Sequence, residues 1–202
     1  MKKSFEQERE KNIERMKEYK VREAITIPYF DHDDKSLRKT VENSSKRRGM
    51  SPLRFALRKM RNIILSRWSY GCSLNSWRVR WNRRRGVTIG EHVYIGQHCM
   101  IDNAYPEYIY IEDNVSLAGN VTILAHSNPY AHFANVVESG VSPVVIKEGA
   151  WVADGAIILR GVTIGKNAIV SAGTVVDKDV PDNSMAKGNP MKIVADFSAL
   201  IN

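Results

Sequence analysis

The second half of the chain repeats a pattern of six residues. From Val87 onward an aliphatic side chain returns at every sixth position, with two longer intervals. A period of six fits neither the 3.6-residue turn of an α-helix nor the two-residue alternation of a hairpin strand. It fits a short strand and a tight corner, stacked on similar neighbours as in a solenoid. The aliphatic slot is filled by Ile89, Ile95, Ile101, Ile111, Leu117, Ile123, Ile146, Val152, Ile158, Ile164, Val170 and Val176.

The other slots of the repeat support the same reading. The slot after the aliphatic residue is often small, as at Gly90, Gly96 and Gly165, and the fifth slot is small or apolar. Gly, Asn and Asp recur at the corners, and these residue types tolerate the positive φ that a tight corner needs. The pattern therefore predicts a mainly β fold whose aliphatic slots fill the interior.

The segment GAWVADGAIILRGVTIGKNAIVSAGTVVDKDVPDNSMAKGNPMKIV, residues 149–194, resembles the hexapeptide-repeat acyltransferases. This resemblance covers roughly residues 86–195 and implies a left-handed parallel β-helix of about four coils. It divides the chain into a helical, basic N-terminal region at 1–85, the β-helix at 86–183 and a C-terminal tail at 184–202. The resemblance also implies a homotrimer that uses acetyl-CoA as co-substrate.

The longest interruption of the repeat gives residues 127–145 room to leave the β-helix as a loop, and His126 lies in the last hexad before it. Spacing alone leaves open a corner histidine that bonds a neighbouring carbonyl. In the sugar O-acetyltransferases that this chain resembles, the catalytic histidine follows a DNVxxxxxVTI stretch and precedes such a loop. Here DNVSLAGNVTILAH matches. The resemblance implies that His126 is the general base for the acceptor hydroxyl, a role suited to an imidazole near neutral pH.

The same resemblance suggests which residues bind the two substrates. Asp102 and its neighbour Asn103 share the candidacy for the acceptor contact, since carboxylate and amide oxygens accept hydrogen bonds from sugar hydroxyls. Five positions match coenzyme A contacts of the family, with Asp154 in place of a smaller polar residue and Lys192 in place of an arginine. These expected cofactor-binding residues are Trp151, Asp154, Ala172, Lys178 and Lys192.

The expected function is thus an acetyl-CoA-dependent O-acetyltransferase acting on a sugar, glycan or lipid-linked glycan hydroxyl. N-acetylation of an amino sugar and longer acyl donors stay open. One alternative is a zinc enzyme like the γ-class carbonic anhydrases, but His92 and His98 fall on successive faces and cannot share one ion within a chain. Another is an inactive β-helix scaffold. We expect no metal site.

The net charge of +8 is concentrated, since residues 43–90 contain thirteen basic and no acidic side chains. A helix is expected from Ser51 and Pro52, with Leu53, Leu57, Met60 and Ile64 at helical spacing. We expect this apolar stripe to cap the open end of the β-helix, whose first strands would otherwise expose an edge. An anionic membrane surface is a second expected partner of residues 43–90. No nucleic-acid motif is present.

Two features bear on location. No apolar run suits a signal sequence or a membrane span, and the two cysteines, Cys72 and Cys99, show no disulfide framework. The expected location is therefore cytoplasmic, with membrane association left open. Residues 1–24, rich in Glu, Lys and Arg, are expected to form an exposed helix.

Overall fold

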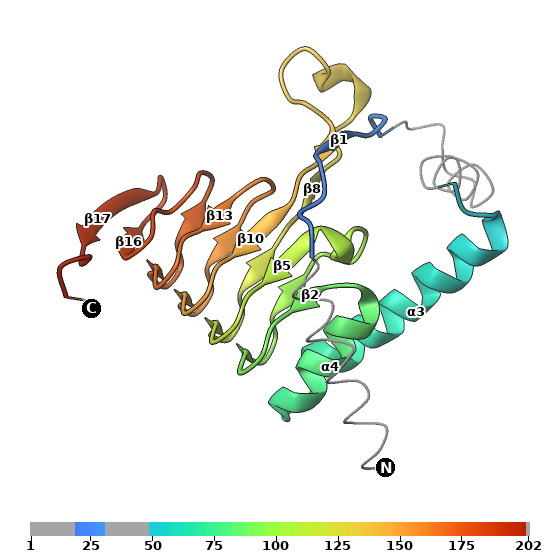
Figure 1. Cartoon of the computed structure of the whole chain (residues 1–202). Helices are drawn as coiled ribbons and strands as arrows, with labels where there is room; N and C mark the ends of the chain where they lie inside the picture. The colour runs from blue at the N-terminus through green and yellow to red at the C-terminus, as the bar shows by residue number, and fades with distance from the viewer. Residues whose placement is uncertain (1–18, 31–48, 201–202) are drawn as a thin grey trace.

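The computed structural model describes residues 19–30 and 49–200, and most of residues 87–187 form a three-sided β prism (Figure 1). Successive strands go in rotation to three parallel sheets, which we call the first, second and third faces. The first face holds β2 (Thr88–Ile89), β5 (Ile109–Ile111), β10 (Val144–Ile146) and β13 (Thr163–Ile164). The second holds β3 (Tyr94–Ile95), β6 (Ser116–Leu117), β11 (Trp151–Val152), β14 (Ile169–Val170), β16 (Ser184–Lys187) and the antiparallel β17 (Lys192–Asp196). The third holds β4 (Met100–Ile101), β7 (Thr122–Ile123), β12 (Ile157–Ile158) and β15 (Val175–Val176).

The aliphatic slot forms the core, as the repeat predicts. Ile89 pairs in register with Ile111, and Ile111 with Ile146, so equivalent side chains stack from coil to coil. All three are fully buried. A fully buried aliphatic side chain contributes on the order of 2 kcal/mol, so the repeated slot is the main apolar contribution to stability.

The corners take the left-handed backbone conformation that the composition predicts. Asn114 and Asn120 have φ of 59° and 58°, and glycines fill equivalent positions in later coils. His92 and His98 adopt the same conformation, with φ of 56° and 59°, which the sequence did not predict. The small second slot has a different cause: a Cβ on Gly96 would lie 2.4 Å from the backbone of the next coil.

Two helices precede the prism, α3 (Pro52–Gly71) and α4 (Asn75–Arg85). Helix α4 closes the prism's first coil through guanidinium groups, one for each face. Arg83 donates to the carbonyl of Ile89, Arg78 to that of Ile95, and Arg85 to that of Ile101. The strand edge is therefore satisfied by side-chain donors.

The expectation that the apolar stripe of α3 caps the prism is wrong. Helix α3 packs inward through the opposite face, whose buried members are Phe55, Asn62, Leu65 and Ser69. The stripe points outward, and Leu53 and Met60 are 71% and 55% exposed. Apolar side chains cannot bond the carbonyls of a strand edge, whereas the arginines of α4 can.

A small antiparallel sheet stands where the loop leaves the prism. It consists of β1 (Ile25–Thr26), β9 (Gly140–Val141) and β8 (His126–Ser127), in that order. Short 3-10 helices lie at Pro106–Tyr108 and Ala131–Phe133. Ile27, which follows β1, is buried, and its N–H donates to the carbonyl of Ser139. Most of the helix expected at 1–24 lies outside the described residues, and 19–24 are not helical.

Candidate functional site

His126 stands at the third–first corner, the corner between the third and first faces, where β8 begins. Its backbone pairs with Val141 of β9, so the imidazole is anchored at the root of the loop. Its Nδ1 lies 2.5 Å from Oδ2 of Asp102, and the side chain is 31% exposed. The ring of Tyr105 lies 5.3 Å from the imidazole, centroid to centroid. An Nδ1–H that is donated to a carboxylate leaves Nε2 with the free lone pair.

The carboxylate of Asp102 has no exposed surface and is fully engaged. Its Oδ1 accepts the N–H groups of Ala104 and Tyr105, and its Oδ2 accepts the N–H of Ala125 as well as the imidazole. Burial alone would raise the pKa of Asp102. The hydrogen bond and charge of His126, with the backbone N–H groups, outweigh burial and hold the pKa below its usual value. Asp102 therefore stays ionised beside the imidazole.

Arg85 lies behind this pair and is almost fully buried. Its Nη2 donates to the carbonyls of Ile101 and Asp102 and to Oδ1 of Asn103, each at 2.8 Å. Burial lowers its pKa to about 10, although the charge of Asp102 acts in the other direction. Sequence reasoning missed Arg85, because a run of three arginines at a helix end usually faces water. The signal available was the open carbonyl edge that the first coil must satisfy.

The structure brings the two expected acceptor residues to the same corner as His126, with different surroundings. Asn103 is exposed, and its side-chain oxygen accepts from Arg85. Asp102 faces inward and holds the imidazole, so its buried oxygens have no surface with which to meet an acceptor in this chain. The geometry gives Asp102 the position of an orienting group.

The expected cofactor residues lie mostly elsewhere. Trp151 is about half exposed on the second face, and Lys192 lies on the same face in β17. Asp154 and Ala172 lie on adjacent coils at the second–third corner, where the carbonyl of Asp154 accepts the N–H of the glycine after Ala172. Lys178 follows β15 at the third–first corner. Within one chain, four of these five residues therefore lie away from the third–first corner that holds His126.

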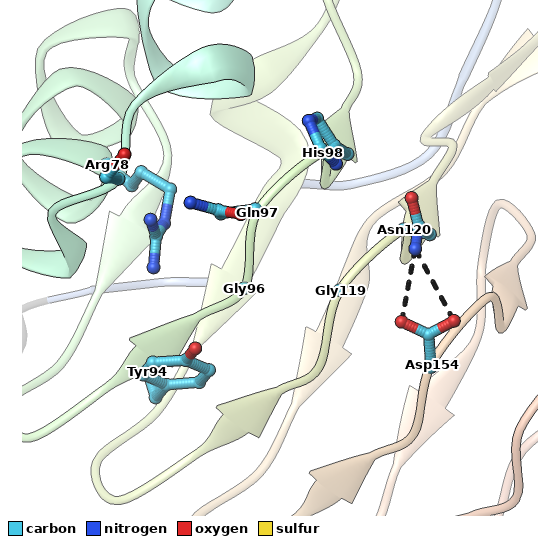
Figure 2. A pocket seen from close by; sticks show the side chains of 9 residues that line it. Arg78, Tyr94, Gly96, Gln97, His98, Gly119, Asn120 and Asp154 are labelled. Atoms are coloured by element: carbon cyan, nitrogen blue, oxygen red, sulfur yellow. Dashed lines mark hydrogen bonds between the residues drawn. The ribbon is translucent and has the colours of Figure 1, made fainter.

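A polar hollow of about 350 Å³ lies at the second–third corner, next to α4 (Figure 2). Arg78 extends toward it from the helix, while Gln97 and His98 come from the turn after β3. On the prism side, the amide of Asn120 donates to both oxygens of Asp154, at 3.2 and 3.4 Å. One expected cofactor residue, Asp154, thus lines this hollow.

The comparisons with known proteins agree with the geometry. The family model "Bacterial transferase hexapeptide (six repeats)" matches residues 143–178. "Putative acetyltransferase YvoF" of Bacillus subtilis (strain 168) is 33% identical over 141 residues, which cover 68% of this chain and 77% of the relative. The chain belongs to the hexapeptide-repeat acetyltransferases. It spans 51% to 63% of the length of other curated acetyltransferases that it matches.

Two solved acetyltransferases have a fold similar to that of this acetyltransferase. A maltose O-acetyltransferase from Clostridium difficile 630 is 28% identical with a TM-score of 0.55, over 70% of this chain and 87% of that one. A galactoside acetyltransferase in complex with coenzyme A is 22% identical with a TM-score of 0.53, over 72% and 83%. These likenesses identify the prism as the left-handed β-helix of the family.

No three or more His, Cys, Asp and Glu side chains in 19–30 and 49–200 are grouped as metal ligands would be. In the same residues, no helix combines the length and the apolar content needed to cross a bilayer.

Proposed function

We propose that the chain is an acetyl-CoA-dependent O-acetyltransferase that acts on a hydroxyl of a sugar or glycan, with His126 as general base. The observation that carries the proposal is the pairing of a partly exposed imidazole with a fully buried carboxylate, 2.5 Å apart. A base must reach the substrate on one side and be held on the other, and His126 meets both requirements.

In the proposed reaction, Nε2 of His126 removes the proton from the acceptor hydroxyl. The hydroxyl oxygen attacks the thioester carbonyl, the carbon–sulfur bond breaks, and the coenzyme A thiolate takes the proton back from the imidazolium. Asp102 fixes the tautomer and stabilises the imidazolium while it exists. Arg85 keeps the turn that carries Asp102 in place through its bonds to the carbonyls of Ile101 and Asp102.

We propose that a homotrimer completes the site. Four of the five cofactor candidates lie on the second face or at the second–third corner of the prism, away from His126. A neighbouring chain that presents its second–third corner to His126 would bring them together. Asn103 then lies on the acceptor side. In this proposal coenzyme A is contacted by Trp151, Asp154, Ala172, Lys178 and Lys192. A galactoside acetyltransferase of the same fold has been solved with coenzyme A bound, which supports a coenzyme A site. The proposed location is the cytoplasm, where acetyl-CoA is available.

The relatives support a sugar as the acceptor class. Sugar acetyltransferases, for maltose and galactosides, are among the structures with this fold. A free sugar, a glycan and a lipid-linked glycan present the same attacking hydroxyl, so the general-base chemistry is the same for all three. Hydrolysis of the product in mild base would identify it as an ester, because the amide that N-acetylation of an amino sugar gives is stable under those conditions.

The test measures coenzyme A release from acetyl-CoA with a panel of maltose, galactosides and glucosamine. His126→Ala is expected to lower kcat about 10²–10⁴-fold, and Asp102→Asn to lower it by a similar order because the wrong tautomer is favoured. His92→Asn is the matched control, since His92 is a corner residue on another edge with a backbone that Asn tolerates. Normal turnover by His126→Ala, with the oligomer intact by light scattering, would remove the mechanism. Failure of acetyl-CoA to raise the melting temperature would favour an inactive scaffold.

A further inference from the structure

The outward face of α3 carries an apolar stripe that nothing in the described chain covers. Leu53, Leu57, Met60 and Ile64 recur at the i, i+4, i+7, i+11 spacing of one helix face. Their exposed fractions run from 42% for Ile64 to 71% for Leu53. A soluble surface rarely leaves an ordered apolar row of this length in water, so the stripe indicates an interaction surface.

Basic side chains flank the stripe on both sides. Arg54 and Arg61 fall on one side of the helix, and Lys59 and Arg67 fall on the other, all of them exposed. The surrounding sequence 43–90 contains no acidic residue. An apolar row between two rows of cations is the arrangement of a helix that lies in the plane of an anionic membrane surface.

Tryptophans extend this surface past the end of α3. The rings of Trp68 and Trp81 lie 5.8 Å apart, and those of Trp77 and Trp81 lie 5.5 Å apart. Trp68 and Trp77 are 57% and 40% exposed, and Leu74 between the two helices is 58% exposed. Tryptophan rings are favoured at the boundary between lipid headgroups and acyl chains. Three of the four tryptophans of the chain therefore gather where α3 meets α4.

We propose that this face of α3, continued by the tryptophans of α4, docks on a membrane that contains anionic phospholipids. Charge decides between a membrane and a second copy of the chain. Two copies meeting through this face would bring two acid-free basic surfaces together, and like charges across an interface cost affinity. Anionic headgroups complement the arginines while the acyl region accepts Leu, Ile and Trp. The helix lies on the bilayer and does not cross it, consistent with its charged flanks.

This inference is independent of the proposed chemistry and can be tested without activity. The full-length protein is sedimented with vesicles of phosphatidylglycerol and phosphatidylcholine at low salt, and with vesicles of phosphatidylcholine alone. Wild type is expected to pellet with the anionic vesicles only. Leu57→Ser and Arg61→Glu are each expected to weaken binding about tenfold or more, from the lost apolar burial and from the reversed charge.

Two matched controls keep the test specific. Leu200→Ser removes an even more exposed leucine, and Lys187→Glu reverses a cation. Lys187 ends β16 and Leu200 follows β17, and these two strands lie at the end of the prism opposite α4 (Figure 1). Both are expected to bind as wild type does. The proposal is overturned if wild type stays in the supernatant, or if Leu57→Ser binds as tightly as Leu200→Ser.

Two further outcomes would assign the face to another occupant and so also overturn the proposal. A change of sedimentation coefficient in Leu57→Ser without lipid would mean that a second copy covers α3. A melting temperature lower than that of Leu200→Ser by several degrees would mean that another segment of this chain covers it.

Discussion

Replacing Arg85 by methionine tests whether the arginines of α4 only stabilise the first coil or whether one of them also positions the Asp102 turn. Arg85 and Arg83 both bond strand-edge carbonyls from α4, but only Arg85 reaches the turn that carries Asp102. Arg85→Met is therefore expected to lower both stability and turnover. Arg83→Met, the matched control, is expected to lower stability alone.

The stability change is a difference between two opposing terms. Loss of the guanidinium leaves two buried carbonyls, those of Ile101 and Asp102, without their donor, at a cost of about 1–3 kcal/mol each. Against this, a pKa of about 10 for Arg85 means that burial already disfavours its charge by about 3 kcal/mol, which methionine removes. The net change in unfolding free energy is expected to lie between a gain of about 1 kcal/mol and a loss of about 3 kcal/mol, so most of the range is destabilising. For Arg83, whose side chain is 20% exposed, water replaces the lost donor and the expected cost is about 1 kcal/mol.

The effect on turnover is expected to be larger than the effect on stability. Without Arg85 the turn 101–103 can shift, and an error of about 1 Å in the orienting carboxylate can cost about 10²-fold in rate. We expect kcat of Arg85→Met to fall about 10- to 100-fold, with KM for acetyl-CoA unchanged, in the coenzyme A release assay. Arg83→Met is expected to stay within about threefold. Equal losses of kcat in the two variants, or a normal kcat in Arg85→Met, would refute the reasoning.

Three other outcomes follow from buried groups. The pKa of Asp102 is depressed in the folded state, so its contribution to stability is complete above the unfolded pKa of about 3.9 and is lost as the pH falls below that value. The difference in unfolding free energy between wild type and Asp102→Asn should therefore shrink below about pH 4. A difference that stays constant with pH would contradict this. Gly96→Ala should cost about 3 kcal/mol in urea unfolding, because its Cβ would meet backbone 2.4 Å away. Gly155→Ala, with open space but φ of 67°, should cost only about 1 kcal/mol, and equal costs would contradict the stacking argument. Burial raises the pKa of the Cys99 thiol and shields it from solvent. At pH 8 a disulfide reagent should therefore label Cys72 quickly and Cys99 only on unfolding. Rapid labelling of both thiols in the folded protein would contradict this prediction.

The repeat made the prism predictable because each coil obeys the same local rule. An aliphatic slot every six residues predicts both the buried ladder and the corners, and the longest break in that period predicts where the loop leaves and hence His126. The link to Asp102 follows from register, since Ile101 pairs with Ile123 and the residues after them lie at the same corner. The period indicates which corner Asp102 occupies but not which way its carboxylate turns, so it could not distinguish an acceptor contact from the observed hydrogen bond to His126.

The N-terminal half was less predictable for a physical reason. An amphipathic pattern says that a helix has an apolar face, and by itself it favours burial of that face. Helix α3 does the reverse, because the end of a β-helix exposes carbonyls and the side chains that satisfy them are those of α4. The pairing of β1 with β9 was also missed, since Ile25 and Val141 are far apart in sequence and β1 is only two residues long.

The guanidinium caps have a consequence for any shortened version of the protein. A fragment that starts after Gly86 would expose the unpaired edges of β2, β3 and β4 together. These edges form the same triangle of backbone groups with which each coil pairs with the next. Such an end can template strands from another molecule, and because the contact is head-to-tail it does not close on itself. We therefore expect a fragment without α4 to associate head-to-tail, because the guanidinium groups that cover this edge are those of α4.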